Sequence, residues 1–199
     1  MKSNGFFIIV VLYAVFYGNA LVNAQSGLSE NWQESEARTV TLYSRAKNDD
    51  RNGGYGKSAF SFWHGLRSDV GTGVTRNNFE IVYGGMNISG DSDWFTVTLV
   101  TDDCGRIRDL GELDWTEIFE VPYLPAAAEP DHGITMSFKS GNLEQSSNGQ
   151  FSKVILGHMY VLHTKDSVAN FYTLFRVDKL KPSDEATISW KNVPSPFND

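Results

Sequence analysis

Apolar and polar side chains alternate at every second position in many segments of this chain after residue 38. The pattern is clearest at residues 39–43, 59–63 and 95–99. Successive side chains of a β-strand point to opposite faces of its sheet, so an alternating segment buries one of its faces. The alternation therefore predicts strands rather than helices.

Similar segments continue along most of the chain. They are residues 39–43, 59–63, 79–83, 95–99, 117–123, 134–138, 153–164, 171–180 and 185–193. Clusters of Gly, Asn, Asp and Ser, which favour turns, separate several of them. These clusters are residues 48–54, 89–93, 140–142 and 148–149. We therefore predict an all-β protein, an antiparallel sandwich or an open barrel.

The last third of the chain gives the most specific prediction. Residues 160–164, 171–177 and 186–190 are alternating runs joined by short turn-forming stretches. Consecutive strands with short connections pair as neighbours, so we expect a three-stranded meander. Aromatic residues occur at both parities of these runs, which indicates that the meander is covered on both faces.

The first 24 residues have the order of a signal peptide. Lys2 precedes an apolar run over residues 6–17, and small or polar residues lead to Ala24. The run is shorter than the roughly 20 residues that a membrane-spanning helix needs. We expect cleavage after Ala24, secretion to the periplasm or the medium, and no stable membrane span in the mature chain. An uncleaved anchor is the alternative. Residues 25–38 are a polar lead-in, and residues 39–199 are predicted to form a single β domain.

The net charge argues against a nucleic-acid partner, and the cysteine content excludes an intramolecular disulfide. The formal net charge is −7, and the predicted cleavage removes a lysine but no acidic residue. An acidic protein repels phosphate groups, so a nucleic-acid partner is not expected. Cys104 is the single cysteine, so an intramolecular disulfide is impossible. Hydrophobic residues make up 41% of the chain, enough for a core without disulfides.

Motifs for catalysis are weak. The chain has four histidines but neither a Gly-x-Ser-x-Gly nor a His-Glu-x-x-His pattern. The carboxylates between Asp109 and Glu117 are interpreted as a solvated run. Asp91 and Asp93, with Asp102 and Asp103, offer oxygens to calcium, but Asx turns explain such spacing better. The sequence favours a binding protein over an enzyme and leaves catalysis open.

Two blocks together resemble a known family. Residues 58–62 (SAFSF) followed by residues 79–88 (FEIVYGGMNI), and the closing meander over residues 159–190, are similar to the HmuY-like family of secreted bacterial haem-binding proteins. The resemblance covers about 60 residues. It implies an all-β scaffold that holds a ligand, haem in that family. The matched blocks do not include positions for axial ligands, so none is carried over.

Candidate axial ligands for haem must therefore come from the residue types of this chain itself. Haem iron takes one or two axial donors, usually His or Met, within apolar walls. His132, Met136 and His158 lie between the matched blocks, and Met159 opens the second block. Met136 alternates with apolar neighbours and is predicted to be a core residue. His132 and His158 are the predicted cofactor-binding pair, with haem the candidate cofactor and no other metal ligand assigned.

Two other function classes remain open from the sequence. A secreted module that binds or cleaves carbohydrate would use Trp32, Trp63 and Trp94 to stack on sugars, with acid and base groups drawn from residues 109–117. A structural envelope protein without a small ligand is the other class. The leading hypothesis is an exported, non-enzymatic β protein that binds a hydrophobic or haem-like small molecule.

Overall fold

The computed structural model describes residues 32–47, 56–70, 79–85, 91–97, 104–118, 120–124, 149–165 and 170–196. The signal peptide at residues 1–24, the strand predicted at residues 134–138, and the side chains of His132 and Met136 lie outside these residues, and they stay predictions. Within the described residues, no helix has the length and apolar character required to cross a membrane.

The described residues form two five-stranded sheets. Sheet A has the order β1-β10-β9-β8-β6, and sheet B has the order β3-β2-β4-β5-β7. The strands of sheet A are β1 (Arg38–Tyr43), β6 (Cys104–Glu112), β8 (His158–Lys165), β9 (Asn170–Lys181) and β10 (Glu185–Val193). Those of sheet B are β2 (Ala59–Ser61), β3 (Leu66–Arg67), β4 (Ile81–Tyr83), β5 (Trp94–Val97) and β7 (Phe151–Lys153).

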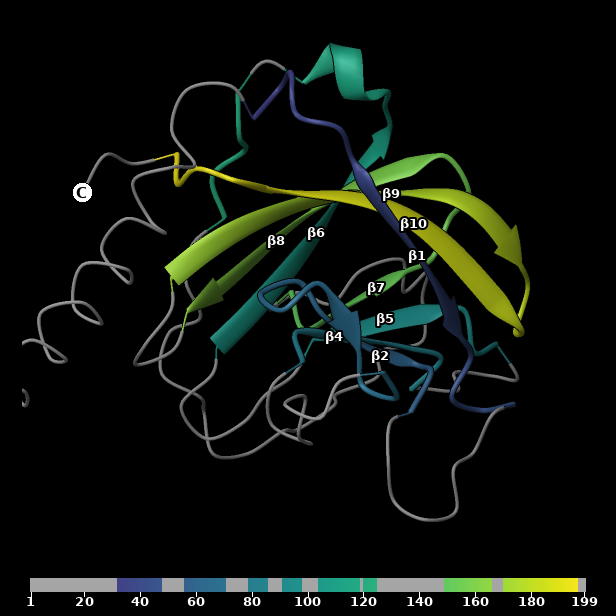
Figure 1. Ribbon diagram of the computed structural model, residues 1–199. Helices are drawn as coiled ribbons and strands as arrows, with labels where there is room; N and C mark the ends of the chain where they lie inside the picture. Colours follow the sequence, from purple (N-terminus) through teal and green to yellow (C-terminus); the bar gives the residue numbers. More distant parts are fainter. Residues whose placement is uncertain are drawn as a thin grey trace, which may run out of the picture.

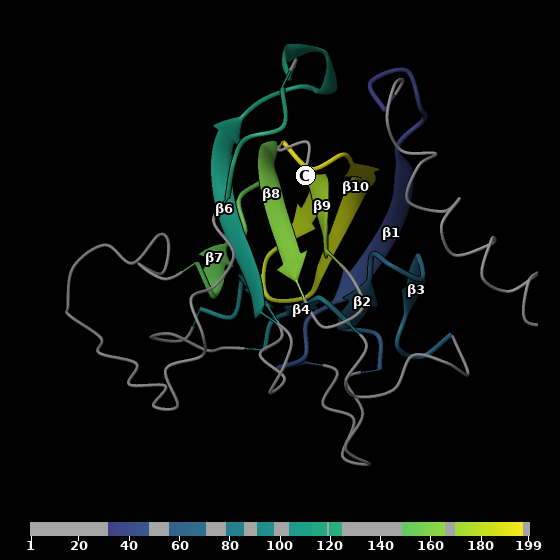
Figure 2. The same ribbon diagram turned by 90° about the vertical axis from the view of Figure 1, so that its left-hand side faces the viewer.

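All strand pairs are antiparallel, and the sheets lie as two layers, with sheet A above sheet B in Figure 1. Figure 2 shows the strands of sheet A side by side from β6 to β1. The predicted all-β, antiparallel fold is confirmed, and the layers are those of a sandwich. The predicted meander is confirmed as well, because β8, β9 and β10 pair consecutively.

Two sequence interpretations were wrong. Residues 117–123 were expected to form a strand, but the short 3-10 helix η1 (Trp115–Glu117) opens this region, and the residues described after it form no ladder. The carboxylates between Asp109 and Glu117 were interpreted as a solvated run, which holds for the exposed Glu112, Asp114 and Glu117 but not for Asp109, whose side chain is partly buried in strand β6 against His158. The paired neighbour β8 makes β6 a strand despite its charges, since tertiary pairing overrides weak local alternation.

The main core fills the space between the sheets with aromatic rings in direct contact. The Tyr160 and Phe175 rings stack at 5.1 Å, and the Phe62 ring meets Trp190 edge-on at 5.4 Å. The buried residues of this cluster are Leu42, Phe60, Phe62, Ile81, Tyr83, Phe95, Val97, Ile107, Val154, Tyr160, Leu162, Phe171, Phe175, Val177, Ala186, Ile188 and Trp190.

A second cluster covers the outer face of sheet A. Its buried residues are Ile118, Leu124, Met159, Val161, Tyr172, Leu174 and Val193. Trp32 and Trp115 pack against it from the N-terminal segment and from η1, both of which lie on the outer side of sheet A in Figure 1. The meander is therefore buried on both faces, as its aromatic pattern predicted.

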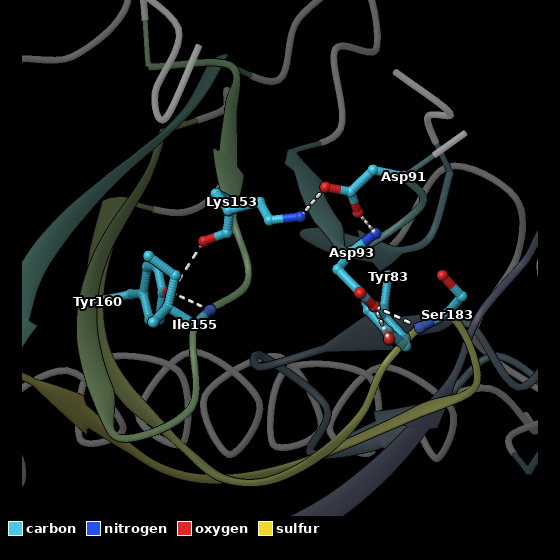
Figure 3. Close-up of polar contacts among 7 residues, drawn as sticks. All are labelled: Tyr83, Asp91, Asp93, Lys153, Ile155, Tyr160 and Ser183. Carbon is cyan, nitrogen blue, oxygen red and sulfur yellow. Dashed lines mark hydrogen bonds and ion pairs between the residues drawn. The ribbon is translucent and has the colours of Figure 1, made fainter. Parts of the chain in front are cut away.

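Polar contacts connect the two layers (Figure 3). The Asp93 carboxylate, at the start of the β5 region, accepts a 2.7 Å hydrogen bond from the backbone N–H of Ser183 in the β9–β10 turn. The same oxygen accepts the Tyr83 hydroxyl. Ser183 has a positive φ of 57°, so the buried carboxylate holds a turn that a non-glycine residue rarely adopts.

Candidate functional site

Two groups of chemistry-bearing side chains stand out in the described residues. The first, here called the His158 pair, consists of His158 on β8 and Asp109 on β6. The second, here called the hairpin cluster, consists of Ser61, His64 and Glu80 near the β2–β3 connection. The exposed ring of Trp63 adjoins it in sequence.

A β-bulge brings the His158 pair together. The register of β6 against β8 shifts between Asp109 and Gly111, and Gly111 has a φ of +87° that favours glycine. The backbone N–H of Gly111 donates a 2.8 Å hydrogen bond to the Asp109 carboxylate. Nδ1 of His158 then lies 3.0 and 2.9 Å from the two carboxylate oxygens. Both side chains are partly buried, with exposed fractions of 24% and 18%.

Tyr160 follows His158 on the same face of β8 and fixes the connection that leads into that strand. Its hydroxyl donates to the Lys153 carbonyl at 2.8 Å and accepts the Ile155 N–H at 3.0 Å (Figure 3). Burial, and secondarily the Asp109 carboxylate, raise the pKa of the Tyr160 phenol well above its ordinary value. The loop before His158 is thereby anchored to the inner face of sheet A.

His163 has a different role from His158. It lies on the opposite face of β8, where its ring stacks on Tyr172 at 4.1 Å. Nδ1 is 2.8 Å from the Leu124 carbonyl, and Nε2 is 2.8 Å from the Asn170 side-chain oxygen. The two histidines are five positions apart on β8, so their side chains lie on opposite faces of the strand. His163 is buried and holds residues 120–124 on the sheet, so we assign it a structural role.

The predicted pairing of His158 with His132 stays a prediction, because His132 lies outside the described residues. Met159 is fully buried in the outer-face cluster and faces away from His158. A search of the described residues finds no group of three or more His, Cys, Asp or Glu arranged around a metal ion. Of the two predicted axial histidines, His158 is the one that the described residues include.

The hairpin cluster is a chain of hydrogen-bonding groups. The Ser61 hydroxyl lies 3.0 Å from Nδ1 of His64 and donates to a Glu80 carboxylate oxygen at 3.4 Å. It also accepts the backbone N–H of His64 at 3.2 Å. The other Glu80 oxygen accepts the backbone N–H of Phe62 at 2.5 Å. Glu80 thereby holds the start of the β2–β3 connection from the neighbouring strand.

Burial raises the pKa of Glu80 to about 7. The hydrogen bonds from Phe62, Ser61 and the backbone of Trp63 favour the charged form and offset part of this effect. A carboxyl group that titrates near neutrality is a feature of functional sites, although structural networks produce it as well.

The three tryptophans considered for sugar stacking differ in exposure. Trp94 is only 4% exposed, whereas Trp63 is 47% exposed. Trp32 packs against the outer-face cluster. Trp63 therefore presents the most accessible of these three rings.

The acidic residues considered for catalysis or calcium have structural partners. Asp114 pairs with Arg176 at 3.1 Å, and Glu117 accepts the Asp114 N–H at 2.6 Å in a capping box. Asp91 pairs with Lys153 and accepts the Asp93 N–H at 2.9 Å. That contact is an Asx turn, so the preferred interpretation of Asp91 is confirmed. Asp102 and Asp103 lie outside the described residues.

Sequence reasoning did not identify the hairpin cluster. Glu80 is a single charged residue in an otherwise apolar segment, 79–83, which was a signal that it needed buried partners. Ser61 and His64 carry no recognisable motif, and only the pairing of β2 with β4 brings them to Glu80. Comparisons with protein-family models, curated proteins and solved structures find no match.

Proposed function

We propose that this chain is an exported, non-enzymatic β-sandwich that binds a haem-like ligand through His158. The observation that carries the proposal is the contact of His158 Nδ1 with both carboxylate oxygens of Asp109. Export is part of the proposal and rests on the signal-like order of residues 1–24.

The Asp109 contact favours coordination by the other ring nitrogen. A carboxylate accepts a hydrogen bond from Nδ1–H, so the neutral imidazole carries its lone pair on Nε2. Metal-binding histidines commonly have this arrangement, because the carboxylate sets the ring orientation and raises the basicity of the ligand nitrogen. In the part of the chain that the structure describes, Nε2 of His158 has no hydrogen-bond partner.

The filled core determines where such a ligand would lie. The space between the sheets is occupied by contacting aromatic rings, including Tyr160 and Phe175. Inserting a haem there would displace the core. The His158 pair lies where β6 ends and β8 begins, so we place the ligand at this edge of the sandwich. His132 is the proposed second axial ligand.

Titration of the mature, untagged protein with ferric haem tests the proposal. Coordination by two imidazoles gives a sharp Soret band and a low-spin spectrum. We expect His158→Ala to lose the low-spin spectrum and to bind haem at least tenfold more weakly. His64→Ala is the matched control, since it removes an exposed imidazole elsewhere, and it should leave the titration unchanged.

Asp109→Asn separates the role of the carboxylate from that of the imidazole. Asparagine keeps the size of the side chain but loses its charge, so we expect haem affinity to fall about 10- to 100-fold while the low-spin spectrum remains at saturation. Circular dichroism of each variant checks the fold. A wild-type protein that leaves the spectrum of free haem unchanged at micromolar concentration would refute the proposal, as would a His158→Ala variant that binds like wild type.

A further inference from the structure

The β2–β3 hairpin and the turn that follows it, which are distinct from the His158 pair, carry exposed apolar side chains. Trp63, Leu66 and Val70 are three of the five large hydrophobic residues found exposed among the described residues. Trp63 is also a residue with a large planar ring, and such rings bind flat apolar faces of ligands. The hairpin therefore exposes an aromatic ring on which a ligand can stack.

The exposed ring of Trp63 is held in position. It contacts Phe171 at the start of β9, with ring centroids 5.6 Å apart and a tilt of 47°. Glu80 accepts the backbone N–H groups of Phe62 and Trp63, which fixes the chain on the N-terminal side of the ring. Gly65, with a φ of +67°, allows the chain to turn directly after His64. A ring fixed before binding loses little conformational entropy when a ligand stacks on it.

A polar side chain follows Trp63 directly in the sequence. His64 is exposed, the Ser61 hydroxyl holds its Nδ1, and Nε2 has no hydrogen-bond partner among the residues that the structure describes. Further along the hairpin, the Arg67 guanidinium contacts the Asp69 carboxylate through two hydrogen bonds of 3.0 and 3.3 Å. The hairpin thus combines one exposed aromatic ring, that of Trp63, with one imidazole, that of His64, held by Ser61.

We propose that Trp63 and His64 form a binding site for a neutral sugar ring. A pyranose offers a flat face of C–H groups to an aromatic ring and hydroxyls to adjacent polar groups, which matches this combination. A protein partner fits less well, because a stable protein interface buries about 1,200–2,000 Å² in total, far more than one ring provides. A site this small and open is expected to bind at millimolar affinity.

Isothermal titration calorimetry with four neutral oligosaccharides tests the site: cellohexaose, laminarihexaose, mannohexaose and chitohexaose. We expect at least one to bind wild type at millimolar concentration. Trp63→Ala should weaken that binding at least tenfold, and Trp63→Phe should retain part of it. Tyr123→Ala is the matched control, since Tyr123 is a similarly exposed aromatic residue at 50% and lies on the segment that follows η1. It should leave the binding unchanged.

His64→Ala is expected to weaken binding by a smaller factor, since it removes one hydrogen-bonding group. The thermal midpoint of each variant, measured beside the titration, shows whether the fold is intact. Absence of binding to all four sugars at 10 mM overturns the proposal, and so does undiminished binding by a folded Trp63→Ala variant. Because haem and sugar are assayed separately and at different residues, failure of one proposal leaves the other standing.

Discussion

The hydroxyl of Tyr83 donates a 2.6 Å hydrogen bond to the carboxylate of Asp93, and both residues are buried. Burial raises the pKa of the Tyr83 phenol well above its ordinary value, and the nearby Asp93 carboxylate adds to the effect. The phenol therefore stays protonated and remains a donor. Since Asp93 also holds the Ser183 N–H, this contact supports the connection between the two sheets.

Removing that hydroxyl should destabilise the protein. Tyr83→Phe leaves the buried Asp93 carboxylate with one donor fewer, so we expect the free energy of unfolding to fall by about 1–3 kcal/mol. Tyr43→Phe is the control, because its hydroxyl makes no hydrogen bond within the described residues. Urea unfolding of both variants measures the difference, and equal losses would contradict this role for Asp93.

Glu80 should make stability depend on pH between about 4.5 and 7. Burial raises its pKa to about 7 in the folded protein, against an ordinary value of 4.5. The folded state therefore retains the proton longer than the unfolded state, and the stabilisation is complete below pH 4.5 and lost as pH rises through 7. Glu80→Gln keeps an acceptor for the Phe62 N–H and cannot ionise. As the pH rises from 4.5 to 8, the free energy of unfolding of Glu80→Gln should rise by about 1–3 kcal/mol relative to that of wild type.

Urea unfolding at pH 4.5, 6 and 8 measures this difference between wild type and Glu80→Gln. The exposed Glu36→Gln is the control, and its curve should stay parallel to that of wild type. Subtracting the curves cancels the contribution of histidines and other carboxylates. If the free energies of unfolding of Glu80→Gln and wild type change with pH in the same way, the pKa of Glu80 is not raised in the folded protein.

Gly84 should tolerate no larger side chain. Its φ is +68°, and a Cβ placed there would lie 2.9 Å from the backbone nitrogen of Arg45 and would also meet the Ser44 side chain. Gly84→Ala therefore combines backbone strain with overlap, and we expect a loss of more than about 2 kcal/mol. Gly111→Ala is the matched control: its φ is +87°, but a Cβ there meets nothing within 4 Å.

The Gly111→Ala control isolates the cost of the positive φ, which we expect to be near 1 kcal/mol. Thermal unfolding of the two variants compares them directly. A Gly84→Ala variant no less stable than Gly111→Ala would show that the chain around Ser44 moves aside without cost.

Local pattern was sufficient for the strands that have one apolar face. The period of two at residues 39–43 and 95–99 predicted strands β1 and β5 and the face that carries Leu42, Phe95 and Val97 into the main core, because alternation is a property of each segment alone. The meander followed from short connections between such runs. Strand β6 was not among the predicted strands, since Ile107 and Leu110 are its only large apolar residues, and pairing with β8 makes it a strand.

The sites depended on tertiary structure. Residue 109 meets residue 158 only through the register of β6 against β8 and the bulge at Gly111, and a shift of one residue would turn Asp109 to the other face. Glu80 meets Ser61 through the pairing of β4 with β2. The sequence by itself determined the all-β class and the chemistry available at each position. Only the tertiary structure decided which side chains meet, because contacts between distant residues arise from strand register and layer packing rather than from local periodicity.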